Sequence, residues 1–447
     1  MLYQPEIETM PLAKLRELQS QRLREQVNYL YKNVPFYKQQ LDEASVDPAS
    51  IKGIEDIRRL PFTKKTDLRD NYPFGLIAVP QKEISRIHCS SGTTGKPTVV
   101  AYTMGDLDIF SECVARSLTA AGCRPGMIMQ NAYGYGLFTG GLGLHYGAER
   151  LGMAVVPVSG GMTERQIMLM KDFGTDALCC TPSYAMTIVE ELQRKGIDKN
   201  SLKLKLAILG AEPWTESIRA GVEAGLGVVA TNIYGLSEIM GPGVSQEDYE
   251  EKGTGSYIWE DHFFSEVVDR HTGEPLPEGT PGVLVFTTLT KKALPLLRYW
   301  TNDICTLHYD KGGKRTHIKM GQIIGRADDM LIIRGVNLFH TQVEAVLEEF
   351  NKLSTNYQLL VSRDGNMDMV TVNVELESDF FNELGIDTIS PEVIKEQPHL
   401  SELYYGFVKK IKDNTGLSMH LHLLVPGAIP RSEGGKLNRI IDLRKKD

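Results

Sequence analysis

Apolar residues recur with helical spacing near the start of the chain and gather into short runs in its middle. Between Leu12 and about Lys32 they return at three- and four-residue intervals, which predicts an amphipathic helix. Further along, the runs GMAVVPV, DALCC and LKLAILG alternate with stretches of helical pattern. Near-continuous apolar strands interleaved with helices are typical of a largely parallel sheet covered on both faces. We therefore expect an α/β domain that binds its ligands at the carboxyl ends of the strands.

The pattern changes twice toward the C-terminus. The segments GVLVFTTLT and LPLLRYWTNDICTLHY predict a β-rich subdomain. From MLIIRG onward the predicted order is strand, helix, hairpin, helix, strand, as in a small ferredoxin-like α+β unit. We place the boundary at Asp328, between a large domain (1–327) and a small C-terminal domain (328–447). The junction has no flexible Gly/Ser tract, which predicts a hinge and a mobile small domain.

Length, charge and cysteine spacing favour a multidomain protein without disulfides and disfavour a nucleic-acid-binding or membrane protein. A chain of 447 residues is too long for one ordinary core. The net charge of −8 disfavours nucleic acid and anionic membranes as partners. No apolar run is long enough to span a bilayer or to serve as a signal peptide, and the six cysteines lack disulfide-like spacing. We expect a cytoplasmic protein with small-molecule partners, for which a homodimer is one assembly to test.

A loop rich in Ser, Thr and Gly at residues 90–96 carries the first candidate chemistry. It offers hydroxyls, approachable backbone N–H groups and a lysine, the groups that wrap a polyphosphate. The Walker pattern is not met, because Ser90 stands where its first Gly is required and Pro97 follows the lysine. A flexible surface loop explains the same composition equally well.

Four later motifs carry further candidates: YGLSEIMGPGV, RYWTND, GRADDM and PRSEGGKLNR. Glu238 in the first follows a strand-like run, and its carboxylate would suit Mg²⁺, which takes one or two carboxylates together with phosphate oxygens. Taken singly, each has an ordinary explanation. Glu238 would be a solvated cap, Asp303 a structurally paired carboxylate, and the Gly-Gly-Lys turn at Lys436 an exposed loop.

In their order along the chain, these motifs together resemble those of the acyl-adenylate-forming superfamily. The segments FTGGLGLHYGAERLG, GAEPW, IWEDHF and ADDMLIIRGVNLF are similar to those of phenylacetate–CoA ligases, and the likeness extends from VPFYK to the C-terminus. The resemblance implies that a carboxylic acid attacks the α-phosphorus of ATP and expels pyrophosphate. Coenzyme A then displaces AMP from the acyl adenylate.

The resemblance also assigns roles to individual residues. Lys436, from the small domain, would bridge the carboxylate and the α-phosphate, Glu238 would hold Mg²⁺ and take part in catalysis, and Asp328 would be the hinge. The nucleotide would be held by Ser90, Ser91, Gly92, Thr93, Thr94, Gly95 and Lys96 at the phosphates, by Gly210, Ala211, Glu212 and Tyr234 around the adenine, and by Asp303 and Arg326 at the ribose, with Gly235 and Ser237 completing the site.

The acid pocket is expected in YGYGLFTGG. Tyr133, Tyr135 and Phe138 would line it, with Pro242 and Gly243 on the other side; aromatic rings favour an aryl acid. Simple core packing of the same rings is the alternative. His262 would serve as a ligand or base, or more simply as a structural histidine.

Two departures from the family pattern matter. The first is Trp300, which stands where relatives usually carry Arg. The second concerns a structural zinc site of many relatives: Tyr257 stands in place of its His ligand, and its Cys-x-Cys pair is missing. Cys305 and His317 remain, and two scattered ligands make a poor tetrahedral set, so no structural zinc is expected. The expected cofactors are ATP and Mg²⁺, with CoA as co-substrate and phenylacetate as the first acid to test. The alternative substrates are indoleacetate and a hydroxybenzoate. The alternative function is that of a catalytically silent nucleotide-binding homologue.

Overall fold

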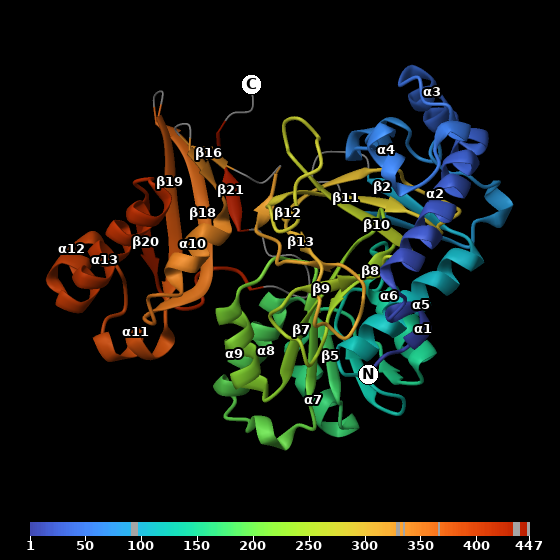
Figure 1. The fold of residues 1–447 in the computed structure, drawn as a ribbon. Helices are drawn as coiled ribbons and strands as arrows, with labels where there is room; N and C mark the ends of the chain where they lie inside the picture. Colours follow the sequence, from blue (N-terminus) through green and yellow to red (C-terminus); the bar gives the residue numbers. More distant parts are fainter. Residues whose placement is uncertain (91–96, 328–330, 334–335, 365–366, 432–438, 445–447) are drawn as a thin grey trace.

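The fold comprises two units, each with its own hydrophobic core (Figure 1). A computed structural model describes residues 1–90, 97–327, 331–333, 336–364, 367–431 and 439–444. The largest core cluster runs from Leu23 to Met320, whereas the C-terminal cluster runs from Leu331 to Leu423. Within those ranges, no helix combines the length and apolar character needed to cross a membrane. The boundary predicted at Asp328 falls outside the described residues and stays a prediction.

The N-terminal segment is helical and packs on the large unit. The helix predicted from Leu12 is confirmed as α2 (Leu12–Asn33), which buries Leu15, Leu23, Val27 and Leu30 along one face. Pro35 ends it and begins α3, because the residue before a proline is driven out of helical geometry. The other elements of this segment are α1 (Pro5–Glu8), η1 (Pro48–Ser50), η2 (Ile54–Arg59), α4 (Lys65–Asp70) and η3 (Gln81–Glu83), with α3 spanning Pro35–Glu43.

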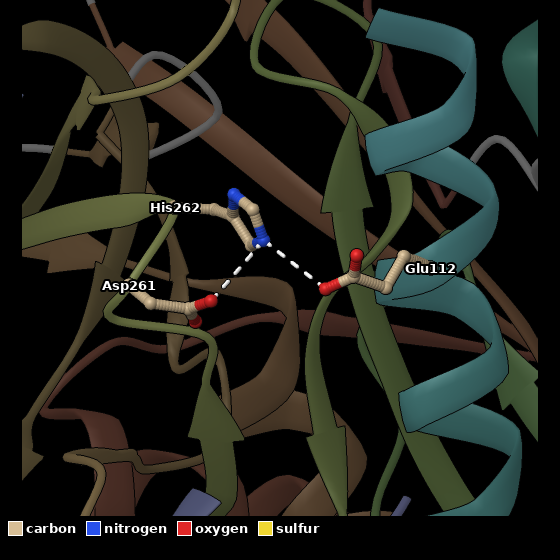
Figure 2. Close-up of side chains that lie close together, drawn as sticks. All are labelled: Glu112, Asp261 and His262. Atoms are coloured by element: carbon tan, nitrogen blue, oxygen red, sulfur yellow. Dashed lines mark hydrogen bonds and ion pairs between the residues drawn. The ribbon is translucent and has the colours of Figure 1, made fainter. Parts of the chain in front are cut away.

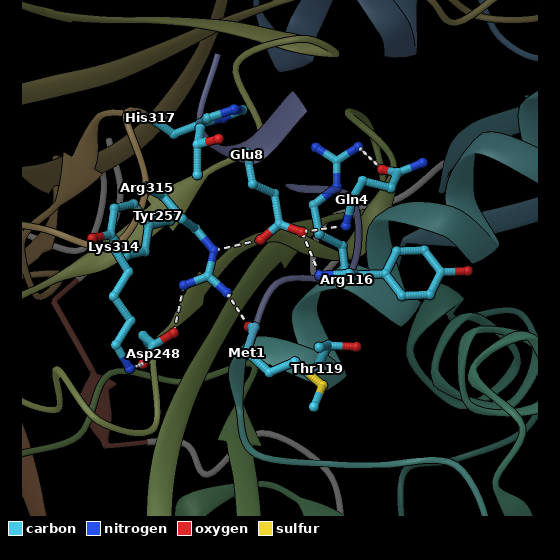
Figure 3. Close-up of polar contacts among 12 residues, drawn as sticks. Met1, Gln4, Glu8, Arg116, Thr119, Asp248, Tyr257, Lys314, Arg315 and His317 are labelled. Carbon is cyan, nitrogen blue, oxygen red and sulfur yellow. Dashed lines mark hydrogen bonds and ion pairs between the residues drawn. The ribbon is translucent and has the colours of Figure 1, made fainter. Parts of the chain in front are cut away.

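A buried ionic network fixes the start of the chain (Figure 3). The Arg315 guanidinium donates to Glu8 Oε2 at 2.6 Å and also pairs with Asp248. The other Glu8 oxygen accepts the backbone N–H of Gln4 at 2.7 Å, and the Gln4 side chain accepts from Arg116. Glu8 and Arg315 are both fully buried, so their charges are compensated by each other and by these neighbours rather than by water.

A nine-stranded mixed sheet forms the centre of the large unit, in the order β13-β14-β9-β8-β7-β6-β5-β3-β4. Its parallel part confirms the predicted alternation of strands and helices, and the remaining strands run antiparallel. The parallel strands are β3 (Ile128–Asn131), β4 (Ala154–Val156), β5 (Ala177–Cys180), β6 (Leu206–Gly210) and β7 (Val229–Leu236); the antiparallel ones are β8 (Gly241–Glu247), β9 (Ser256–Ile258), β13 (Leu307–His308) and β14 (Lys319–Met320).

Helices cover both faces of this sheet, as the apolar strands require (Figure 1). On β5, Cys179 packs into the cluster that contains Phe110, whereas Leu178 and Cys180 pack into the cluster that contains Tyr184. Because successive strand residues point to opposite faces, this alternation places one helical layer on each side. The helices are α5 (Met104–Ala120) and α6 (Thr139–Leu151) on one face, and α7 (Thr163–Phe173), α8 (Pro182–Arg194) and α9 (Glu216–Leu226) on the other, with η4 (Lys199–Ser201) between α8 and β6.

The predicted β-rich subdomain is a four-stranded antiparallel sheet in the order β10-β11-β12-β15. Its strands are β10 (Phe263–Val268), β11 (Gly282–Thr288), β12 (Tyr299–Cys305) and β15 (Gly325–Arg326). A separate hairpin of β1 (Arg86–Ser90) and β2 (Thr98–Tyr102) flanks the Ser/Thr/Gly loop. The two predicted β-rich segments contain β11 and β12, whereas the sequence did not single out β1, β2, β10 or β15 as strands.

The C-terminal unit departs from the predicted ferredoxin-like order at its first strand and at its edge strand β21, which the sequence did not predict. The segment MLIIRG forms β16 (Leu331–Ile333), which pairs with β17 (Val336–Leu338) instead of joining the four-stranded sheet β20-β19-β18-β21. Two residues separate β16 from β17, too few for a crossover, so these strands pair locally. The remaining elements are α10 (His340–Leu347), β18 (Leu353–Asp364), β19 (Met367–Leu376), α11 (Ser378–Leu384), α12 (Pro391–Glu396), α13 (Pro398–Thr415), β20 (His420–Leu424) and β21 (Ile440–Asp442).

Candidate active site

The ends of the predicted phosphate loop are held by the β1–β2 hairpin. Ser90 pairs with Thr98 across it, and the backbone N–H of Cys89 donates to Leu137 O at 2.9 Å. The loop therefore starts beside the segment expected to hold the acid. Ser91, Gly92, Thr93, Thr94, Gly95 and Lys96 lie outside the described residues, as does the side chain of Ser90, so their phosphate contacts stay predictions.

The predicted adenine-binding residues gather at the carboxyl ends of the neighbouring strands β6 and β7. Gly210 ends β6 opposite Ile233 of β7, and a Cβ at this position would overlap the Ile233 carbonyl oxygen. Ala211 follows with a φ of 72°. This turn directs Glu212 to the start of α8, where its Oε1 accepts the backbone N–H of Ser183 at 2.7 Å. The local backbone thus leaves an open edge of the kind at which α/β sheets bind ligands.

Asp303 joins the two sheets of the large unit. Tyr234 of β7 donates its hydroxyl to Asp303 Oδ2 at 2.6 Å, and Arg326 of β15 donates Nη1 to Asp303 Oδ1 at 3.0 Å. Burial and the neighbouring Asp303 carboxylate raise the pKa of Tyr234, which therefore remains a hydroxyl donor. Tyr234 and Arg326 thus orient the two carboxylate oxygens, and a carboxylate oxygen can accept more than one hydrogen bond, which suits Asp303 to the hydroxyls of a ribose.

Glu238 lies in a tight turn between β7 and β8. It is 5% exposed, and Lys65 Nζ approaches its carboxylate at 3.7 Å. Gly235 permits the turn, because a Cβ there would overlap the carbonyl of Gly241. Beside Glu238, the hydroxyls of Ser237 and Thr139 are 3.0 Å apart. One buried carboxylate among oxygen donors fits Mg²⁺, which completes its octahedron with water and phosphate oxygens.

The residues predicted for the acid pocket have different environments. Tyr133 is 7% exposed and donates its hydroxyl to Cys180 O at 2.6 Å, as core packing alone would require, whereas Phe138 is 51% exposed. Tyr135 is half-buried and bonds the Asn131 amide at 2.9 Å. The backbone of Tyr135 and the ring of Pro242 both lie against α6, whose glycines permit the approach.

Phe110, a residue that the sequence did not single out, lies beside the glycines that flank Pro242. A Cβ on Gly241 or on Gly143 would overlap the ring of Phe110 on α5. Phe110 is therefore part of the wall behind the predicted pocket. Its only signal in the sequence was a place on the apolar face of a helix, which does not distinguish a pocket wall from an ordinary core residue.

A cavity of about 520 Å³ is linked to Glu238 through Lys65. Lys65 lines the cavity, and its Nζ lies 3.7 Å from the Glu238 carboxylate. Trp300, the departure from the family pattern, forms one wall in edge-to-face contact with Phe62 at 5.1 Å between ring centroids. Lys64, Arg270 and His271 also line it, and the described lining residues include no carboxylate. The cavity thus presents positive charge beside the candidate metal ligand.

His262 belongs to an ion network instead of the candidate site (Figure 2). Its Nε2 lies 3.1 Å from Asp261 Oδ2 and 3.5 Å from Glu112 Oε1, and Arg116 donates to the same two carboxylates. Burial alone would raise the pKa of Glu112, but His262 and Arg116 lower it to about 2. Since a guanidinium already occupies oxygens that a metal would need, the arrangement supports the structural role of this histidine.

The region in which the family resemblance suggested a comparison with zinc-binding relatives holds a buried lysine, Lys319. Lys319 Nζ donates to Glu251 at 2.9 Å and to Asp310 at 2.8 Å, and it lies 4.6 Å from the centroid of the Tyr257 ring. His317 hydrogen-bonds backbone groups of Ile258 and Glu260. Among the described residues, Cys305 and His317 belong to no group of three potential metal ligands. The absence of a structural zinc stays a prediction.

Comparison with known proteins identifies the family. Residues 6–289 match the AMP-binding enzyme model, and residues 335–444 match the AMP-binding enzyme C-terminal domain. The chain belongs to the AMP-binding enzyme family. This AMP-binding enzyme is 61% identical over 446 residues to a phenylacetate–coenzyme A ligase of Thermus thermophilus, covering all of both chains. It is 48% identical to the Escherichia coli K12 phenylacetate–coenzyme A ligase over 98% of this chain and 97% of that one.

Solved structures extend the likeness to the arrangement of the two units. A 2-hydroxyisobutyryl-CoA ligase in the postadenylation state, bound to 2-HIB-AMP, is 26% identical and superposes with a TM-score of 0.89 over 98% of this chain and 91% of that one. The same ligase with CoA in the thioesterification state gives 0.72 over 99% and 93%. The AMP-binding enzyme therefore has an arrangement closer to the postadenylation state.

Glu190 on α8 links the two units in this arrangement. It accepts from the Asn356 amide at 3.2 Å and pairs with Arg431 at 3.1 Å. Arg431 also binds the buried Glu375 at 2.8 Å, so it is fixed within the small unit. The predicted catalytic Lys436 follows Arg431 along the chain but lies outside the described residues, as does the predicted hinge Asp328. Their roles stay predictions.

Proposed function

We propose that this AMP-binding enzyme is an ATP-dependent aryl acid–CoA ligase that converts phenylacetate, ATP and CoA into phenylacetyl-CoA, AMP and pyrophosphate through an acyl adenylate. The main support is the meeting of Tyr234, Asp303 and Arg326 at the carboxyl edge of the sheet. This occurs in a chain 61% identical over its whole length to a phenylacetate–coenzyme A ligase.

The nucleotide would be bound between the two sheets. Asp303 would accept the ribose hydroxyls, since Tyr234 and Arg326 already orient its two oxygens. The adenine would lie against the edge formed by residues 210–212 and Tyr234. The loop 90–96 would take the β- and γ-phosphates, and the α-phosphate would then lie near Glu238.

The chemical difficulty is the approach of an anionic carboxylate to a polyanionic phosphate. Glu238 would hold Mg²⁺, whose charge offsets that of the phosphate oxygens. Lys65, beside Glu238, would add a fixed positive charge, and Lys436 would bridge the attacking carboxylate and the α-phosphate. Removing one group that stabilises developing charge typically lowers the rate by about 10²–10³-fold.

The acid would lie between Tyr135 and the β8 turn at Pro242 and Gly243, with Phe110 behind the turn. Aromatic and glycine-lined walls suit a flat aryl group on a short carboxylate arm. Tyr133 would support this wall from the core rather than touch the acid, because its hydroxyl is bound to Cys180 O.

Acid-dependent exchange of pyrophosphate into ATP tests the proposal. Phenylacetate should support the fastest exchange, and adding CoA should then release AMP and the thioester in equal amounts. Faster exchange with indoleacetate or a hydroxybenzoate would reassign the acid. Binding of ATP without exchange for any acid would favour a catalytically silent homologue. The use of Mg²⁺, a cytoplasmic location and a homodimer stay predictions from the sequence.

A further inference from the structure

A buried lysine lies beneath the turn that carries Glu238. Lys291, between β11 and β12, is fully buried, and its Nζ donates to the backbone carbonyls of Glu238 at 3.2 Å and Ile239 at 3.0 Å. The same ammonium lies 4.7 Å from the centroid of the Tyr102 ring. A buried lysine is costly unless its charge is compensated, so this placement is unlike that of an ordinary surface lysine.

Lys291 and Tyr102 together hold successive carbonyls of the turn. The Tyr102 hydroxyl donates to Met240 O at 2.7 Å, next to the two carbonyls bound by Lys291. Within the turn, the N–H groups of Ile239 and Met240 both lie 3.1 Å from Leu236 O, which makes it a short helical turn. A cation at the carbonyl end of such a turn is favourable, because the peptide dipoles point their negative ends toward it.

The backbone of Lys291 is itself held on both sides. Its carbonyl accepts the Gln26 amide at 2.6 Å, and the next two backbone N–H groups, of Lys292 and Ala293, donate to the Asp106 carboxylate at 2.6 and 2.8 Å. Asp106 is 1% exposed. The backbone that carries the Lys291 side chain is therefore fixed to α2 and α5.

We propose that Lys291 is a positioning residue that fixes the Glu238 turn from below, so that the Glu238 carboxylate is presented to Mg²⁺ and the phosphates of ATP. This inference rests on the proposed function, in which Glu238 holds Mg²⁺. Lys291 touches neither substrate nor metal and acts through the backbone of residues 238 and 239. Loss of a residue that orients a metal ligand typically costs about 10–100-fold in metal affinity or activity.

Carboxylates and backbone carbonyls compensate the buried charge of Lys291. Burial lowers the pKa of Lys291 to about 8, against the opposing effects of Asp106 and Glu238. The titratable and charged groups that face it are Asp106 on α5, Tyr102 on β2, His88 on β1 and Glu238 on the turn. Together with the two turn carbonyls, the carboxylates offset the cost of burying the ammonium at this place.

The test is calorimetric binding of ATP at a series of Mg²⁺ concentrations, without acid or CoA. Lys291→Met, which keeps the length of the side chain and removes its charge, should raise the Mg²⁺ concentration for half-maximal binding by about 10–100-fold. Lys291→Arg should recover most of that loss. Lys292→Met is the matched control: Lys292 is exposed and contacts the Tyr29 ring, so binding should stay as in the wild type.

Glu238→Gln separates failure of this proposal from failure of the proposed function. If Glu238→Gln leaves the Mg²⁺ dependence unchanged, the assigned metal role of Glu238 is wrong. If Glu238→Gln raises the requirement and Lys291→Met does not, Lys291 is no positioning residue. If both raise it, Lys291→Met in the Glu238→Gln background should add less than threefold, because Lys291 acts through Glu238.

Tyr102→Phe offers a test even if Lys291→Met does not fold. It removes the hydroxyl that donates to Met240 O and leaves Lys291 in place, so loosening the same turn should also raise the Mg²⁺ concentration for half-maximal binding of ATP. An unchanged Mg²⁺ dependence in a folded Tyr102→Phe variant would overturn the claim that holding the carbonyls of this turn presents Glu238 to the metal.

Discussion

Replacing Asp303 by Asn tests the centre of the candidate nucleotide site. The Asp303 carboxylate accepts the Tyr234 hydroxyl on one oxygen and Arg326 on the other, and in the proposed function it also accepts the ribose hydroxyls. Asparagine has nearly the same volume but offers one oxygen and one NH₂ group. Whichever way the amide is turned, its NH₂ faces one of these two donors, so one side of the ribose site loses its acceptor.

The expected loss follows from the bonds that change. A hydrogen bond to a charged group contributes roughly 1.5–3 kcal/mol, and the substitution removes one such bond to the ribose and makes the other neutral. The sum is about 3 kcal/mol, which corresponds to a roughly hundredfold rise in the Kd for ATP. Arg326 is 31% exposed, so water can solvate the guanidinium in the variant and the cost in stability should be smaller than the cost in binding.

Calorimetry with ATP and with 2′-deoxy-ATP measures the effect. The wild type should bind ATP more tightly than the deoxy analogue, and Asp303→Asn should bind both weakly with little discrimination between them. Asp198→Asn is the matched control, because Asp198 caps the short helix η4 through Asn200 N–H and asparagine caps equally well. An unchanged Kd for ATP in a folded Asp303→Asn variant would refute the reasoning.

Three further substitutions probe other parts of the structure. Glu8→Gln leaves the buried Arg315 with one fewer anionic partner. Denaturant titrations should show a free energy of unfolding lower by about 3–5 kcal/mol. A variant as stable as the wild type would contradict a buried ion pair between Glu8 and Arg315. Gly235→Ala should abolish adenylation, because the added Cβ would overlap the Gly241 carbonyl. If this variant exchanged pyrophosphate into ATP at the wild-type rate, the tight turn at Gly235 would be wrong. Burial raises the pKa of Glu344 to about 7, so its folded state holds a proton that the unfolded chain releases near 4.5. Stability should therefore fall as the pH rises from about 4.5 to 7, by roughly 3 kcal/mol, and Glu344→Gln should reduce that fall when melting is followed against pH.

Local periodicity and motif order predicted much of the fold. The sequence predicted the helix from Leu12, the parallel strands and the β-rich subdomain. Each of these elements buries apolar residues that recur along the sequence with the period of a helix or a strand. The exception is β16, whose apolar pattern is the same whether it pairs with β17 or joins a larger sheet. Strand partners depend on distant residues, and local pattern does not specify them.

Motif order grouped some residues of the candidate site and did not reach others. Tyr234, Asp303 and Arg326 come from three separate motifs and lie in contact in the structure, and their roles in nucleotide binding stay predictions. Lys65 and Lys291 went unnoticed, because a single lysine near a helix start or between two strands looks like a surface residue. Only the fold shows that both lie beside Glu238.

The most direct test of the account is a crystal structure of the enzyme grown with ATP, Mg²⁺ and phenylacetate. The account predicts adenosine between Tyr234 and the 210–212 edge, the ribose hydroxyls on Asp303, and the metal within reach of Glu238. Adenosine bound elsewhere, with Asp303 and Glu238 free of ligand, would contradict it.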